Sequence, residues 1–117
     1  MLADTFKDKV IIITGASSGI GLASARLFGS MGAKVVMAAR SLEKLESEAP
    51  SVSADAEKVL CVKTDVTREE DCRNLIEKTV ERFGRIDILV NTAGMSMRAM
   101  FKDEGLPAYV RIPLPNR

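Results

Sequence analysis

Residues 9–21 read KVIIITGASSGIG, and this stretch decides the fold. Its first part, residues 10–13, is a β-branched run without alternation, which is typical of a parallel strand buried on both faces. A turn of small residues follows, and helical spacing begins at Ile20. This order places a helix N-terminus at the carboxyl edge of a sheet, where free N–H groups and the helix dipole favour an anion. The stretch therefore predicts a phosphate-binding turn, with a purely structural turn as the alternative.

Strands and helices alternate along the rest of the chain. Short apolar runs at residues 34–39 (KVVMAA), 58–63 (KVLCVK) and 86–90 (IDILV) predict three further strands. Four strands separated by three helical segments predict an α/β fold with a parallel sheet and right-handed crossovers.

The three helices have recognisable starts and ends. In the first, an apolar stripe is formed by Ile20, Ala23, Leu27 and Met31, and Gly32 suits its C-terminal cap. A second, short helix starts at the N-cap Ser41, and its end and a surface loop are expected over residues 47–57, which contain Pro50. A third helix starts at Thr67, with Glu70 completing a capping box, and ends at Gly84.

Length and composition describe one ordinary globular domain. The chain has 117 residues, a net charge of +1, 46% hydrophobic residues and 28% charged residues. The balanced charge does not favour nucleic acid, and no stretch is long and apolar enough to cross a membrane. Residues 1–9 do not resemble a signal peptide, so a cytoplasmic location is expected, with Cys61 and Cys72 as free thiols. The sequence has no histidine and no paired cysteine spacing, so no metal site is expected.

The spacing of the glycines suggests a family. Thr14, Gly15, Gly19 and Gly21 form the pattern Thr-Gly-x-x-x-Gly-x-Gly. This pattern resembles the cofactor-binding signature of the classical short-chain dehydrogenase/reductase family. The resemblance implies a Rossmann-type fold of three layers with strand order 3-2-1-4, and a dinucleotide cofactor as the partner of the turn.

Two further motifs resemble the same family, and the resemblance covers residues 6 to about 103. Asp65 and Val66 follow the third strand, where the family holds the adenine ring; a plain turn or cap residue is the alternative for Asp65. Residues 91–94 (NTAG) resemble the family's Asn-Asn-Ala-Gly motif, with Thr92 in place of the second Asn. The resemblance assigns cofactor binding to Gly15, Ser17, Ser18, Gly19, Ile20, Gly21, Arg40, Asp65, Val66, Asn91, Ala93 and Gly94.

The residue that follows the second strand bears on the choice of cofactor. In a dinucleotide fold an acid at this position binds the ribose 2′-hydroxyl of NAD, whereas an arginine suits the 2′-phosphate of NADP. Residues 38–41 read AARS, with Arg40 and no acid. Arg40 together with the hydroxyls of Ser17 and Ser18 favours NADP over NAD, and an ordinary surface arginine is the alternative.

The catalytic residues of the family have no match in this chain. The family uses a serine and a Tyr-x-x-x-Lys pair, but the only tyrosine is Tyr109, and Pro113 stands at the lysine position. Residues 1–94 are thus expected to form an NAD(P)-binding half-domain and residues 95–117 an irregular tail. The chain looks truncated after the fourth strand, so it is expected to be inactive alone. We expect it to form homo-oligomers, or to associate through that strand as an exposed sheet edge.

Three hypotheses about function stay open on these grounds. One is the cofactor-binding half of an oxidoreductase, and another is a nucleotide-binding or interaction module without catalysis. A plain α/β domain without a ligand is the third, simplest alternative.

Overall fold

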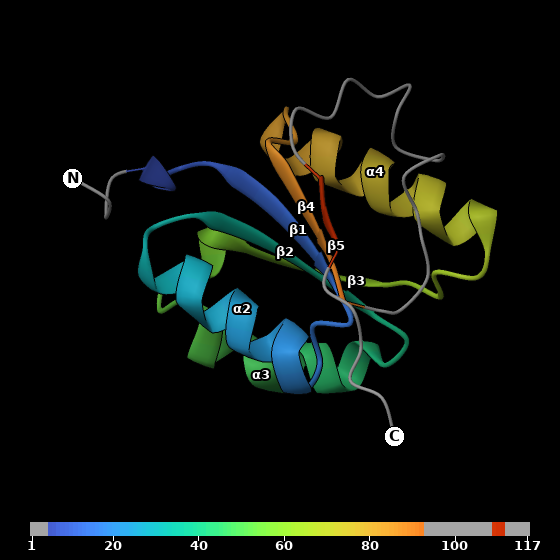
Figure 1. Cartoon of the computed structure of the whole chain (residues 1–117), viewed down its shortest axis with the longest axis horizontal. Coiled ribbons are helices and arrows are strands. Elements are labelled where there is room, and N and C mark those ends of the chain that lie inside the picture. Colours follow the sequence, from blue (N-terminus) through green and yellow to red (C-terminus); the bar gives the residue numbers. More distant parts are fainter. Residues whose placement is uncertain (1–4, 93–108, 112–117) are drawn as a thin grey trace.

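The structure, a computed structural model, describes residues 5–92 and 109–111. Within these residues it contains a parallel sheet with the strand order β3-β2-β1-β4-β5 (Figure 1). The predicted order 3-2-1-4 is confirmed for the first four strands. The strands are β1 (Val10–Thr14), β2 (Lys34–Ala39), β3 (Val59–Lys63), β4 (Ile88–Asn91) and β5 (Tyr109–Arg111).

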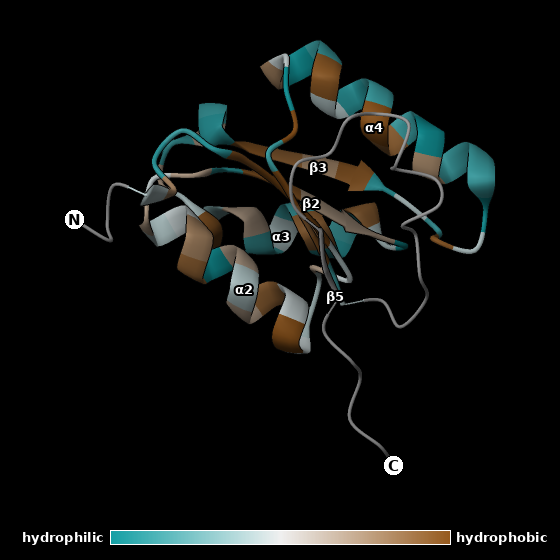
Figure 2. Cartoon of the chain, turned by 45° about the horizontal axis from the view of Figure 1, so that its top comes forward, coloured by the Kyte–Doolittle hydropathy of each residue, from teal (hydrophilic) through white to brown (hydrophobic). Residues whose placement is uncertain are grey.

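Helices cover both faces of the sheet and complete the three layers. One face carries α2 (Gly19–Ser30) and α3 (Leu42–Val52), and the other carries α4 (Glu69–Phe83) (Figure 1). A short 3-10 turn, η1 (Ala56–Lys58), leads into β3. Figure 2 shows the hydrophobic strands between these helices. No helix in residues 5–92 has the length and apolar character needed to span a membrane.

The uninterrupted β-branched run of β1 is buried on both sides of the sheet. Ile11 and Ile13 pack under α2 and α3, whereas Val10 and Ile12 belong to the cluster under α4. All four side chains are fully buried. The run therefore fills two separate cores, as the lack of alternation predicted.

A buried carboxylate, that of Asp87, joins the starts of the neighbouring strands β1 and β4. Asp87, just before β4, accepts a hydrogen bond from the Val10 N–H at 2.8 Å, and its other oxygen is paired with Arg85. Burial raises the pKa of Asp87, but the hydrogen bond from Val10 and the nearby Arg85 guanidinium outweigh it, so the pKa lies below its usual range.

The fifth strand corrects the prediction that the sheet ends after β4. β5 pairs in parallel with β4, with Tyr109, Val110 and Arg111 in register with residues 89–91. β4 is therefore an interior strand, and the expected exposed edge at this strand is wrong, as is an irregular conformation for residues 109–111. A three-residue strand between Pro107 and Pro113 is too short to show periodicity in the sequence. The rest of the predicted tail lies outside the described residues.

The apolar stripe predicted for α2 does not face the core. Ile20 is 40% exposed and Leu27 is 53% exposed, whereas Gly21, Leu22 and Ala25 are buried. The inward face combines the small residues Gly21 and Ala25 with Leu22 and Phe28, which pack in the core under α2 and α3. Gly21 and Ala25 let the helix backbone approach the sheet closely, so this face is the one that packs inward.

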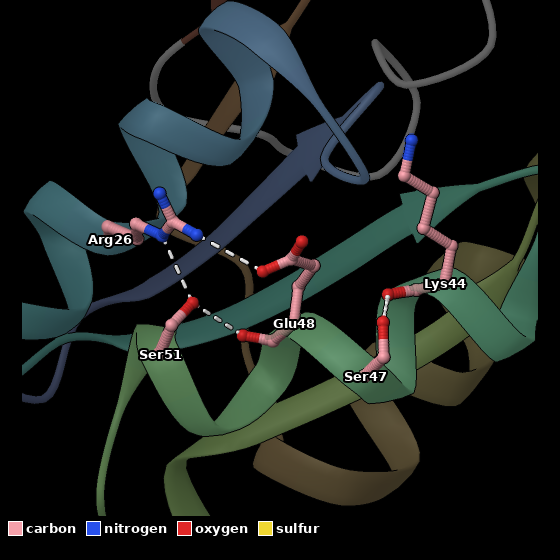
Figure 3. Close-up of polar contacts among 5 residues, drawn as sticks. All are labelled: Arg26, Lys44, Ser47, Glu48 and Ser51. Atoms are coloured by element: carbon pink, nitrogen blue, oxygen red, sulfur yellow. Dashed lines mark hydrogen bonds and ion pairs between the residues drawn. The ribbon is translucent and has the colours of Figure 1, made fainter.

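α2 and α3 are in close contact near their C-terminal ends. A Cβ added at Gly29 would lie 2.0 Å from the Val52 carbonyl oxygen, so glycine is required for this approach. On the surface, Arg26 donates to Ser51 at 3.0 Å and to Glu48 at 3.1 Å (Figure 3). Such exposed pairs add little stability, so the backbone contact defines the helix pair.

α3 ends at Val52, within the stretch 47–57 where its end was predicted, and the helix continues through Pro50. The missing N–H of Pro50 removes a hydrogen bond only in the last turn of the helix. Val52 is 3% exposed, and its burial holds that turn against the sheet and α2. The predicted N-cap is confirmed, since the Ser41 hydroxyl accepts from the Lys44 N–H.

The start of α4 also differs from the prediction, and its end agrees. The helix begins at Glu69 with Arg68 as N-cap, and no capping side chain is involved. Thr67 instead donates its hydroxyl and its N–H to Asp65, so the predicted capping box with Glu70 is wrong. Gly84 ends the helix in the left-handed conformation, as predicted.

Candidate functional site

The carboxyl edge of the sheet collects the sequence-predicted residues. The glycine-rich turn connects β1 to α2, Arg40 follows β2, and Asp65 follows β3. Asn91 is the last residue of β4. Because all strands run in parallel, these positions meet at one edge although they are up to 76 positions apart in the sequence. Ala93 and Gly94 lie outside the described residues.

The turn leaves an open surface at the N-terminus of α2, formed by residues 17–20 and called the ledge below. Gly19, the first helical residue, has φ = 56°, and a Cβ added there would meet nothing within 4 Å. Ser18 is the N-cap in an extended conformation, but its side chain makes no capping hydrogen bond. Ser18, Gly19 and Ile20 are exposed and Ser17 is half-buried. The ledge thus presents the N-terminal backbone of a twelve-residue helix to a ligand.

The last glycine of the motif has a different task. A Cβ added at Gly21 would lie 2.0 Å from the Gly15 carbonyl oxygen and 2.8 Å from the Thr92 hydroxyl. Gly21 thereby allows α2 to start directly against the turn and the end of β4. The exposed ledge at Gly19 depends on this close approach for its position.

A buried network of hydrogen bonds joins the ends of β1 and β4 next to this turn. Thr14 donates its hydroxyl to the side-chain oxygen of Asn91 at 2.6 Å. The Thr92 N–H donates to the Thr14 hydroxyl at 3.2 Å, and the Thr92 hydroxyl donates to the Thr14 carbonyl at 2.5 Å. These bonds join the ends of β1 and β4, which is the sheet-bracing role that the resemblance implies for Asn91.

Thr92 is a residue whose role the sequence did not reveal. As a departure from the family motif, it left the contacts of the second position undefined. In the structure it is 6% exposed and makes two hydrogen bonds to Thr14. The available signal was a threonine at the end of β1 and another directly after β4, where each hydroxyl can bond the backbone of the other residue.

Arg40 and Asp65 lie next to each other at the ends of β2 and β3. An Arg40 guanidinium nitrogen is 3.8 Å from the carboxylate oxygen of Asp65, and the Arg40 side chain is 76% exposed. The same Asp65 oxygen accepts from the Thr67 hydroxyl at 2.6 Å and from its N–H at 3.0 Å. These two bonds, with Arg40 and Arg68 nearby, hold the pKa of Asp65 below its usual range, so it is ionised at neutral pH.

Asp65 therefore does serve as a turn residue, the simpler role considered from the sequence. Its N–H donates to Asp71 at 2.9 Å, which fixes the segment between β3 and α4. Val66 is half-buried, and its carbonyl accepts a weak bond from the Cys72 thiol at 3.7 Å. The turn geometry leaves Asp65 31% exposed, so the carboxylate remains accessible from the carboxyl edge of the sheet.

A separate hollow lies at the outer edge of the sheet. It has a volume of about 500 Å³ between α3, η1 and β3, and none of the predicted site residues line it. Cys61 forms part of its wall; burial, and then the charge of Glu46, raise the pKa of this thiol. Cys61 and Cys72 are both free, as expected.

Comparisons with known proteins agree with this geometry. The family model for short chain dehydrogenases matches residues 9–111 and so extends past residue 103, where the resemblance was expected to end. An uncharacterized oxidoreductase of Listeria monocytogenes is 50% identical over 91 residues, which are 78% of this chain. The chain spans only 37% of the length of that protein.

Two solved structures with similar folds contain nicotinamide cofactors. The 3-ketoacyl-(acyl-carrier-protein) reductase of Brucella melitensis, in complex with NADH, is 37% identical with a TM-score of 0.71; the match covers 78% of this chain and 36% of that one. The C-domain of a bacterial malonyl-CoA reductase, with NADP, is 36% identical with a TM-score of 0.73 and coverages of 80% and 16%. The sequence, the sheet order and these matches together show that the chain belongs to the short chain dehydrogenase family.

Proposed function

We propose that this chain is the nicotinamide-dinucleotide-binding part of a short-chain dehydrogenase/reductase. The observation that carries the proposal is the open ledge at Gly19, supported from behind by the close contact at Gly21. Bound NADP(H) would supply the hydride that such enzymes exchange with a carbonyl or alcohol substrate. Because the chain spans about a third of the length of the relatives that it matches, we assign it the cofactor-binding role alone.

The residues present fit a dinucleotide along the carboxyl edge. The N-terminus of α2 offers backbone N–H groups and the positive end of its dipole to the diphosphate. Ser17 and Ser18 precede Gly19 in the same turn, and their hydroxyls would face the phosphate. As the resemblance implies, Asp65 and Val66 would hold the adenine ring, the Ala93–Gly94 backbone would lie along the cofactor, and Asn91 would brace the sheet beside it.

We further propose that NADP is preferred to NAD. Arg40 follows β2 directly, its side chain is largely exposed, and residues 38–41 contain no acid. A guanidinium at this position suits a 2′-phosphate, with which it forms charge-assisted hydrogen bonds. NADH in the Brucella relative and NADP in the malonyl-CoA reductase support a nicotinamide dinucleotide in general.

One observation favours the second candidate, a dinucleotide-binding module without catalysis. Tyr109, the only tyrosine, lies in strand β5 opposite Leu89, whereas the family's catalytic tyrosine and lysine share a helix. We therefore expect no reductase activity from the 117-residue chain. Steady NADPH oxidation with aldehydes or ketones, in proportion to protein, would contradict this.

The cellular setting is also a proposal. Two free cysteines suit a reducing compartment, which supports a cytoplasmic location. Formation of homo-oligomers stays a prediction, and it now has to use a surface other than the edge of β4.

Gly19→Ala tests the proposed function, with Gly84→Ala as the matched control. Both glycines have positive φ (56° and 77°), and an added Cβ meets open space at both, so the conformational cost is similar, at about 1 kcal/mol. Only Gly19 lies on the ledge. We expect Gly19→Ala to weaken NADPH binding about tenfold or more and Gly84→Ala to leave it unchanged, as measured by calorimetry. If both variants bind NADPH with equal affinity, the dinucleotide does not bind at this turn.

A further inference from the structure

The proposed 2′-phosphate site contains a negative charge of its own. Arg40, the residue proposed to bind the phosphate, lies 3.8 Å from the Asp65 carboxylate. An anionic group of the protein and an anionic group of the cofactor would thus share one guanidinium. A stronger Arg40–Asp65 ion pair must weaken the binding of the phosphate by Arg40. In return, a bound phosphate must weaken the Arg40–Asp65 ion pair.

We infer that Asp65 sets the selectivity between NADPH and NADH by competing with the 2′-phosphate for Arg40. The inference rests on the proposed function and adds a specificity-determining role to a residue assigned only to the adenine ring. NADH presents no phosphate to Arg40, so the competition affects NADPH alone. The adenine contact is common to both cofactors, and it cancels in the ratio of their affinities.

Thr67 determines how strongly Asp65 competes. Its hydroxyl and N–H both donate to the Asp65 oxygen that faces Arg40, at 2.6 and 3.0 Å. With two donors already bound, this oxygen keeps Arg40 at the distance of a loose ion pair, beyond hydrogen-bond range. Thr67 thereby leaves the guanidinium available for a phosphate.

Two substitutions with opposite expected signs test the inference. Asp65→Asn keeps the shape and the acceptor for Thr67 but removes the charge, so Arg40 is released. Thr67→Val removes the hydroxyl and frees the Asp65 oxygen to bind Arg40 more closely. We expect the NADPH-to-NADH affinity ratio to rise about two- to fivefold in Asp65→Asn and to fall by a similar factor in Thr67→Val, the range for an exposed ion pair.

The matched control is Glu69→Gln, which removes a negative charge at the start of α4. Glu69 pairs with Arg73 on the same helix, and among the described residues Arg40 forms its ion pair with Asp65 instead. The NADPH-to-NADH affinity ratio of Glu69→Gln should equal that of the parent. Raising the salt to 1 M, where charges are screened beyond about 3 Å, should reduce the shift in Asp65→Asn.

The measurement is calorimetric titration of the full 117-residue chain and its variants with NADPH and NADH, with far-UV circular dichroism to confirm folding. An unchanged ratio in either variant, a change of opposite sign, or a shift that high salt does not reduce would overturn the inference. If the parent binds both cofactors, the proposed function survives that result. If the parent binds neither, both the proposed function and the inference are wrong.

Discussion

Replacing Gly21 by alanine tests how the ledge is held in position. The added Cβ would lie 2.0 Å from the Gly15 carbonyl oxygen and 2.6 Å from its carbonyl carbon, whereas ordinary contact begins at 3.4 Å. Both atoms belong to the backbone, so no side-chain rotation relieves the overlap. The N-terminus of α2 must therefore move away from the turn. The Thr92 hydroxyl, at 2.8 Å from the same Cβ, would be displaced as well.

The expected cost follows from overpacking at a buried site. Such substitutions cost about 1–3 kcal/mol, and a rigid backbone neighbour places this one in the upper half of that range. Alanine gains about 0.4–1 kcal/mol through the less flexible unfolded chain, because Gly21 is not among the glycines with positive φ. The net loss is about 1–2.5 kcal/mol, against a total of about 5–15 kcal/mol for a domain.

Urea unfolding followed by circular dichroism measures this loss. With an m-value of about 1–2 kcal/mol/M, the midpoint should fall by about 1 M. NADPH binding should weaken in the same variant, since the N–H groups of α2 move with the helix. An unchanged midpoint together with unchanged binding would refute the close contact between Gly21 and Gly15 and, with it, the position of α2.

Two further predictions concern the joints between β1 and β4. Asp87→Asn should lower the free energy of unfolding at pH 7 by about 1.5–3 kcal/mol, because a charge-assisted bond to the Val10 N–H is weakened. Since the pKa of Asp87 is lowered by folding, this contribution is present above the usual value of 3.8 and is lost as the pH falls below it. Parent and variant should therefore converge in urea titrations below pH 3.8; a constant difference would contradict the assignment. Thr92→Val should cost about 1–3 kcal/mol, because the buried Thr14 carbonyl loses its hydroxyl donor. An unchanged urea midpoint would show that this bond contributes nothing.

The sequence by itself determined the order of elements and the sheet edge at which the candidate site residues lie. The run at residues 34–39 predicted β2 to the residue, and Gly84 ends α4 where the glycine stands. Both are local signals, since burial of a whole strand and a left-handed cap are written in neighbouring residues. The alternation of strands and helices then implies a parallel sheet, and a parallel sheet brings Gly19, Arg40 and Asp65 to one edge.

Only the tertiary structure decided which face of α2 is buried, how the sheet continues and how Arg40 is paired. A helical period identifies an apolar stripe around Leu27, but the contact of Gly21 with Gly15 turns another face inward. β5 is too short to leave a pattern, and it exists through pairing with β4. The 3.8 Å between Arg40 and Asp65 depends on β2 and β3 being neighbours. These features arise from distances between residues that are remote in the chain, and a local pattern carries no information about such distances.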